Sequence, residues 1–202
     1  MKNLIRITHS MMRAFGLDLF KMINAFRELP IFLRNYIDFK RQNRHNFNDF
    51  PITRIFPCLE DKRLNNGSVN GHYFHQDLLV ARRIKDLKPD RHVDVGSRID
   101  GFVAHVASFR SIDVIDIRPM PFKIPNINFI QADMMLRPDQ LVECCDSLSC
   151  LHAIEHFGLG RYGDTLKRDG HIEGLENLDL MLKKKGTFFF STPIGPQRIE
   201  FN

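Results

Sequence analysis

The sequence predicts an α/β fold in which a doubly wound, mainly parallel sheet follows an N-terminal helical arm. From residue 72 onward, short apolar runs alternate with helical segments, which is the pattern of parallel strands covered by helices. The first 45 residues instead carry a basic, amphipathic helical pattern. We therefore divide the chain into an arm (1–45), a linker (46–71) and an α/β domain (72–202).

The composition is that of an ordinary globular protein. Hydrophobic residues make up 43% and charged residues 26% of the 202 residues, and no stretch has the roughly 18 consecutive apolar residues of a membrane span. The four cysteines form no CxxC pair, so we expect reduced thiols, no metal site and a cytoplasmic location.

The net charge of +5 is concentrated in the arm. Residues 1–45 contain nine Lys and Arg against three acidic residues, and the rest of the chain contains 20 against 21. A nucleic-acid-binding domain would carry a basic face on its folded body, so we expect no nucleic-acid partner.

The arm begins with an apolar periodicity of three and four residues, which predicts one helix over about 10–29 that ends at Pro30. A second helical stretch is expected over 31–41. Two interpretations stay open: the arm packs on its own domain or a second subunit, or it makes peripheral contact with an anionic membrane surface. The residues of the predicted apolar face are Met11, Phe15, Leu19, Met22, Ile23 and Phe26.

A polar, turn-rich linker then leads into a helix that starts near residue 72 and ends near Pro89. The best helices after it are 101–109 and 172–182. The expected strands are 92–95, 112–117, 127–132, 147–151 and 187–191. The chain ends soon after the fifth strand, so we expect an open sheet edge that a homo-oligomer or another element covers.

In a doubly wound sheet, ligands bind beyond the carboxyl ends of the strands. The first strand ends in a turn with small residues that let backbone approach a ligand, and Asp116 follows Gly96 by twenty residues, a spacing typical of ribose-binding acids. Asp133 follows the third strand. The candidate cofactor-binding residues are Asp94, Gly96, Ser97, Arg98, Asp116, Asp133 and Leu151.

The fourth strand leads directly into His152, Glu155 and His156. An HxxEH sequence on a long helix is typical of zinc proteases, but Gly158 and Gly160 would break such a helix within one turn. Two interpretations remain for these residues. Either they act in acid–base catalysis, or the histidines only satisfy local hydrogen bonds.

Several strings of this sequence resemble known families. The succession VDVGS, DVIDIR, FIQADM, DSLSCLHAIEHFG and GTFFFSTPIG is similar to the strand ends of Rossmann-like S-adenosylmethionine-dependent methyltransferases. The longer strings GHYFHQDLLVARRI, VDVGSRIDGFVAHVASF, HAIEHFGLGRYGD and PIGPQRIEFN resemble the family called domain of unknown function 268. Together they cover about residues 70–202.

The resemblance implies that the backbone around Gly96 approaches the methionine part of the cofactor, that Asp116 holds the ribose and that Asp133 holds the adenine amine. It further implies that the methyl acceptor lies beside 152–156. The methyltransferase sheet normally has two further strands, which this chain lacks, and the narrower family is associated with glycan biosynthesis.

We therefore expect an S-adenosylmethionine-dependent methyltransferase that acts on a small-molecule or glycan hydroxyl. His156 is the first choice for the general base and His152 the second, with Glu155 orienting either one. The alternatives are a catalytically silent Rossmann-like binding or scaffold protein, and another nucleotide-cofactor enzyme such as a nicotinamide-dependent one.

Overall fold

The computed structural model describes residues 2–42, 52–59, 71–196 and 199, and the chain divides into two compact units, Met1–Ser68 and Val69–Asn202. Most of the expected linker, 46–51 and 60–70, lies outside the described residues, as does the end of the expected arm, 43–45.

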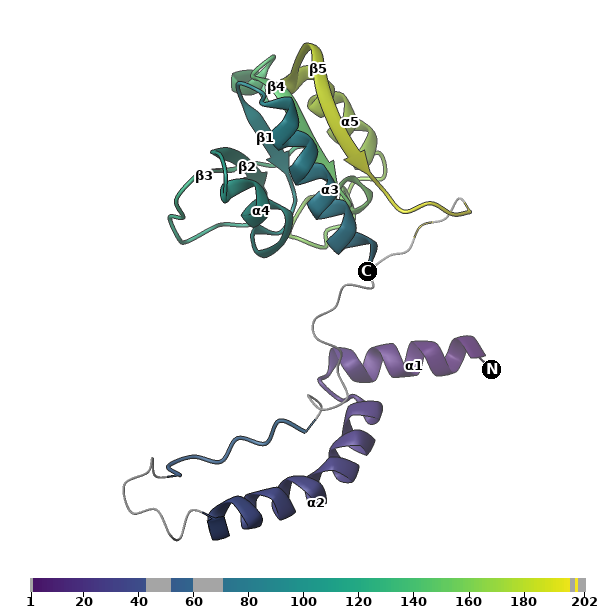
Figure 1. The fold of residues 1–202 in the computed structure, drawn as a ribbon. Coiled ribbons are helices and arrows are strands. Elements are labelled where there is room, and N and C mark those ends of the chain that lie inside the picture. The colour runs from purple at the N-terminus through teal and green to yellow at the C-terminus, as the bar shows by residue number, and fades with distance from the viewer. Residues whose placement is uncertain (1, 43–51, 60–70, 197–198, 200–202) are drawn as a thin grey trace. The chain divides into compact units, whose positions relative to one another are not determined.

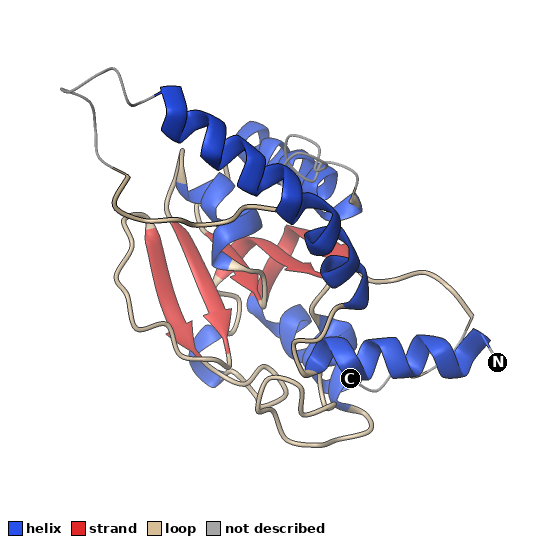
Figure 2. Cartoon of the chain, turned by 90° about the horizontal axis from the view of Figure 1, so that it is seen from below, coloured by secondary structure: helices blue, strands red, loops and turns tan. Residues whose placement is uncertain are grey.

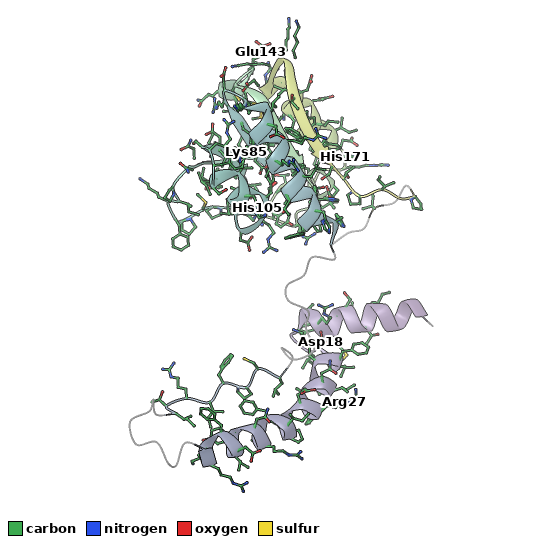
Figure 3. The ribbon with its side chains drawn as sticks, in the orientation of Figure 1. Asp18, Arg27, Lys85, His105, Glu143 and His171 are labelled. Atoms are coloured by element: carbon green, nitrogen blue, oxygen red, sulfur yellow. The ribbon has the colours of Figure 1, made fainter. Side chains whose placement is uncertain are left out.

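The described part of the first unit contains the helices α1 (Lys2–Ala14) and α2 (Leu19–Gln42). The continuous helix expected over 10–29 is therefore wrong, because the chain turns at Gly16, whose φ is +79°. Asp18 then starts α2 anew: its Oδ1 accepts the backbone N–H groups of Phe20 and Lys21 at 3.1 and 3.2 Å. Figure 3 labels Asp18 at this junction.

The expected end at Pro30 is also wrong, since α2 runs through this residue. A proline inside a helix removes one backbone hydrogen bond and bends the helix, but does not always end it. The apolar spacing continues on both sides of Pro30 and joins the two expected helices into one. Figure 1 shows that α2 is curved.

The second unit is an α/β domain with a five-stranded, entirely parallel sheet in the order β3-β2-β1-β4-β5. This confirms the predicted fold class. Figure 2 shows the strands of this sheet in red. The strands are β1 (His92–Val95), β2 (Ile112–Asp116), β3 (Ile127–Gln131), β4 (Cys145–Leu151) and β5 (Leu182–Ser191), and the main helices are α3 (His72–Leu87), α4 (Ala104–Ala107) and α5 (Gly170–Met181).

Helices cover both faces of the sheet, which makes it doubly wound (Figure 1). On one face, Ile84 of α3 and Val106 of α4 pack against strand residues such as Val114. On the other face, Leu178 and Met181 of α5 pack against alternate residues of β1 and β4. Burying the two faces of β1 and β4 fixes these strands at the centre of the domain.

Two strands begin earlier than the sequence pattern predicts. β4 starts at Cys145, and β5 starts at Leu182 rather than at residue 187. The pairing shifts from Cys145↔Leu182 to Ser147↔Thr187, so the extra residues of β5 form a bulge in this edge strand. Its lysines are exposed and give no apolar alternation, which is why the pattern places the start too late.

None of the helices in the described part of the chain is both long and apolar enough to cross a membrane.

Candidate functional site

The carboxyl ends of β1 to β4 surround one pocket of about 520 Å³, its open mouth included. It lies where the strand order reverses between β1 and β4, the usual ligand position in such sheets. Besides Gly96, the polar residues that line it are Asp116, Arg118, Asp133, His152, His156, Tyr162 and Asp164. The structure thus brings together five of the residues that the sequence singled out.

Gly96 ends β1 at the pocket wall, with a φ of +79°. A Cβ added there would lie only 2.7 Å from the Cβ of Ala153, the second residue after β4. The turn after β1 and the end of β4 therefore approach closely, and any larger residue at position 96 would force them apart. Backbone at this position is accessible to the pocket.

Asp94 does not reach the pocket, because its side chain is fully buried. It accepts hydrogen bonds from the backbone N–H of Ser97 at 3.1 Å, from Ser97 Oγ at 2.9 Å and from Ser149 Oγ at 2.5 Å. Asp94 therefore shapes the turn after β1 and acts on the pocket only through that turn.

The same network extends to His92, whose ring nitrogens lie 2.8 Å from Ser147 Oγ and 3.2 Å from Ser149 Oγ. Burial lowers the pKa of His92 to about 3 and raises the pKa of Asp94 to about 6. Two titratable groups with opposite shifts thus share one buried network between β1 and β4.

These two pKa shifts predict opposite changes of folding stability with pH, which partly cancel. The contribution of neutral His92 is present above its ordinary pKa of 6.5 and is lost as the pH falls toward 3. The contribution of protonated Asp94 is present below 3.8 and is lost as the pH rises through 6. When the pH falls from 7 to 5, the His92 contribution lowers the free energy of unfolding by about 2 kcal/mol. The Asp94 contribution raises it by about 1 kcal/mol over the same range.

Urea unfolding at pH 7 and pH 5 checks this prediction. The wild type is expected to lose about 1 kcal/mol between pH 7 and pH 5. The His92→Gln variant is expected to be more stable at pH 5 than at pH 7, and the Asp94→Asn variant more stable at pH 7 than at pH 5. If the free energy of unfolding changed with pH in the same way in all three proteins, the assignment of this pH dependence to His92 and Asp94 would be wrong.

Asp116 lies in the pocket after β2, but both of its carboxylate oxygens already have a partner. Arg118 donates from Nε to Oδ1 at 2.9 Å and from Nη2 to Oδ2 at 2.5 Å, and its backbone N–H also reaches Oδ1. The guanidinium stacks over the ring of Tyr162 at 4.3 Å. A ligand that uses Asp116 must therefore displace Arg118.

Asp133 follows β3 and lies in the pocket between Ala132 and Met134. Its Oδ1 accepts the backbone N–H of Met135 at 2.9 Å, which fixes the turn after β3. The carboxylate is half-buried and therefore combines a fixed position with access to the pocket.

His152 follows β4 with a φ of +51°, an uncommon backbone conformation for a residue other than glycine. Its Nδ1 lies 3.2 Å from Glu155 Oε1, and its side chain is only 9% exposed. The rings of His72 and Tyr73, at the start of α3, lie 4.9 and 4.8 Å from the His152 ring. Because a carboxylate only accepts, Nδ1 carries the proton and Nε2 of a neutral His152 is the basic nitrogen.

Two buried polar atoms beside His152 have no hydrogen-bond partner within the described part of the structure: Glu155 Oε2 and Ser191 Oγ. Glu155 adjoins His152 through its other oxygen, and the Ser191 carbonyl accepts the His152 backbone N–H at 3.0 Å. Buried polar groups are normally paired, so each of these two atoms is suited to a hydrogen bond with a water molecule.

His156 lies on the other side of the same turn. Burial and the nearby Arg161 guanidinium lower the pKa of His156, so the imidazole is neutral at physiological pH. Arg161 Nη1 lies 3.4 and 3.5 Å from its ring nitrogens, and the Tyr162 ring meets it edge-on at 5.6 Å.

Sequence reasoning missed the loop that places these residues. Asp164 accepts the backbone N–H groups of Gly158, Gly160 and Tyr162 at 2.8, 3.1 and 3.2 Å. Both glycines have a positive φ. The signal was an aspartate that follows a glycine-rich segment, which indicates a turn closed by backbone donors.

The remaining predicted cofactor residues lie outside the pocket. Leu151 is buried in the core that faces α3. Ser97 and Arg98 line a neighbouring open pocket, where Arg98 pairs with Asp100 at 2.6 Å. Asp116 and Arg118 line both pockets, so their ion pair lies at the boundary between them.

The turn that contains 152–156 has only one short 3-10 helix, Ile154–His156, rather than the long helix of a zinc protease. Across the described residues, no group of three His, Cys, Asp or Glu side chains is placed to hold a metal ion.

Comparisons with known proteins identify a family model and solved structures that this chain resembles. No curated protein matches the chain. The chain is similar to a crystal structure of the methyltransferase domain of bacterial CtHen1-CN, with a TM-score of 0.43 and 17% identity, over 59% of this chain and 66% of that chain. Residues 121–202 match the family described as Caenorhabditis protein of unknown function, DUF268, which confirms the resemblance seen in the C-terminal strings.

Proposed function

We propose that this protein is an S-adenosylmethionine-dependent methyltransferase that acts on a hydroxyl of a small molecule or glycan. One observation carries the proposal. A single pocket at the switch point of a doubly wound sheet collects Gly96, Asp116, Asp133 and His152, and Nδ1 of His152 pairs with Glu155 behind the pocket wall.

The side chains of the pocket fit this cofactor. Asp116 and Asp133 offer acceptor oxygens for the two ribose hydroxyls and the adenine amine, and apolar residues such as Ile115 and Phe157 line the space near them. The pocket contains three carboxylates, including that of Asp164, and one guanidinium. An excess of negative charge favours a ligand that carries a sulfonium cation.

When the cofactor binds, Asp116 exchanges its hydrogen bonds with Arg118 for hydrogen bonds with the ribose. The ribose hydroxyls take the place of the Arg118 guanidinium, which is 42% exposed and is therefore able to move into solvent. The resident ion pair lowers the affinity for the cofactor by the free energy needed to break it.

The cofactor supplies an electrophilic methyl group. Transfer to a hydroxyl requires that the acceptor be aligned and that its proton be removed. We assign the base to His152: Glu155 holds Nδ1–H at 3.2 Å, which leaves Nε2 to take the proton and stabilises the imidazolium that forms.

The contacts favour this assignment over His156, which the sequence ranks first. His156 contacts the cationic Arg161 rather than a carboxylate, and this neighbour disfavours a second positive charge on its ring. We propose that His156 lines the acceptor side of the pocket as a neutral hydrogen-bonding group.

Calorimetric titration tests the proposal. S-adenosylmethionine and S-adenosylhomocysteine are expected to bind the wild type, and NAD is not. The Arg118→Ala variant frees Asp116 and is expected to bind about tenfold more tightly, the scale of one partly exposed ion pair. The matched control is Arg98→Ala, which breaks a similar pair outside the pocket and is expected to change affinity less than about threefold.

The absence of heat from both sulfur ligands, in the wild type and in Arg118→Ala alike, would contradict the proposal. The Arg118–Asp116 pair also favours a second candidate, a catalytically silent Rossmann-like binding or scaffold protein, because it fills the ribose position with a protein side chain. That negative result would support this second candidate.

A further inference from the structure

The N-terminal helices carry a long apolar stripe that is exposed within their unit. On α2 the stripe repeats every three or four residues, and its members are 38–71% exposed. On α1 and at the residue that follows it, the corresponding side chains are Ile7, Met11 and Phe15, at 54%, 61% and 84%. The α2 members, hereafter the α2 stripe, are Leu19, Met22, Ile23, Phe26, Leu29, Leu33 and Ile37.

Basic residues accompany this stripe. Arg27 and Arg34, one heptad apart, flank it along α2, and Lys40 and Arg41 occupy the last turn of the helix (Figure 3 labels Arg27). Across 1–45 the nine basic residues outnumber the three acidic ones, which gives a net charge of +6. An apolar face bordered by Lys and Arg is the pattern of helices that lie in a membrane interface.

Net charge decides between three surfaces that could cover the apolar face of the N-terminal helices: a second copy, the rest of the chain and a lipid membrane. Pairing with a second copy would bring two segments of charge +6 together, and like charges disfavour that arrangement. The remainder of the chain is nearly neutral, with 20 basic and 21 acidic residues, and offers no net opposite charge. An anionic lipid surface supplies both an apolar layer and negative headgroups.

We propose that α1 and α2 bind the surface of anionic membranes, with the α2 stripe in the headgroup–acyl boundary and the arginines at the phosphates. Neither helix meets the requirements of a membrane span, so the contact is with the surface. The inference does not depend on the proposed enzymatic function, because it uses only residues of the first unit.

Flotation of the full chain with lipid vesicles tests the proposal. Vesicles of phosphatidylcholine with about 30% phosphatidylserine are expected to carry most of the protein to the top of the gradient, and pure phosphatidylcholine vesicles are not. Raising NaCl from 0.15 to 0.5 M is expected to reduce recovery at least severalfold, since salt screens the headgroup attraction.

Two single substitutions form a matched pair. Phe26→Asp places a negative charge in the α2 stripe and is expected to lower the apparent affinity for anionic vesicles about tenfold or more. Asn35→Asp adds the same charge nine residues later, on the opposite face of the helix, and is expected to lower it less than about threefold. Both positions are exposed, so circular dichroism should show unchanged helix content.

Three outcomes would overturn the proposal: no flotation with anionic vesicles, equal flotation with neutral ones, or equal losses in the two variants. If flotation fails and sedimentation shows a dimer that Phe26→Asp dissociates, a second copy covers the stripe instead.

Discussion

Replacing Asp116 with alanine is expected to weaken S-adenosylmethionine binding about 100-fold or more. The change removes two acceptor oxygens from the ribose position, and hydrogen bonds to charged groups contribute about 1.5–3 kcal/mol each. It also leaves the Arg118 guanidinium without its carboxylate inside the pocket, where it repels a sulfonium cation. Calorimetric titration of the purified variant measures the loss.

The matched control is Asp100→Ala. Asp100 pairs with Arg98 two residues away, as Asp116 pairs with Arg118, but it is 70% exposed and lines only the neighbouring pocket. Its removal is expected to change affinity less than about threefold. Asp116→Asn preserves the side-chain volume and should lose most of the affinity as well. If Asp116→Ala and Asp116→Asn both bind as the wild type does, the ribose assignment is wrong.

Replacing Gly158 with alanine is expected to destabilise the domain by about 3 kcal/mol or more and to open the pocket. The φ of Gly158 is +82°, and a Cβ there would lie 1.9 Å from the carbonyl oxygen of Lys167, which accepts the Gly170 N–H. Gly158 N–H is also one of the donors that Asp164 gathers. Urea unfolding measures the loss of stability.

Gly163→Ala separates steric overlap from backbone strain. Gly163 has a similar φ of +88°, but no atom lies within 4 Å of an added Cβ. The Gly163→Ala substitution is expected to lower the free energy of unfolding by about 1 kcal/mol, from the unfavourable backbone conformation alone. Equal losses for the two variants would show that the contact between 158 and 167 does not hold this loop.

Much of the α/β domain could be predicted because its strands are short apolar runs that end in polar residues. β1 matches its predicted range, and β2 and β3 differ by one residue. Both faces of the central strands are buried, so their sequences give a strong signal. The edge strand β5 was placed too late because its first residues are exposed lysines.

The arm shows where periodicity alone fails. The apolar spacing continues across Gly16, although the backbone there turns left-handed and Asp18 starts a new helix. The same spacing continues across Pro30, where the helix persists. Local breakers and caps decide helix ends, and a steady apolar pattern conceals them.

The candidate site was predicted only in part. The topology of parallel strands brings Gly96, Asp116 and Asp133 to one edge, and this follows from the sequence. The pairing of Arg118 with Asp116 does not, since it depends on the conformation of the turn after β2. Likewise the choice between the two histidines required the position of Glu155 relative to each ring.

A crystal structure with S-adenosylhomocysteine tests the central claim most directly. The account predicts the ribose hydroxyls within hydrogen-bond distance of Asp116, the adenine amine at Asp133, and Arg118 turned away from the Asp116 carboxylate. A ligand bound elsewhere, with the Arg118–Asp116 pair intact and the pocket at the strand ends empty, would contradict it.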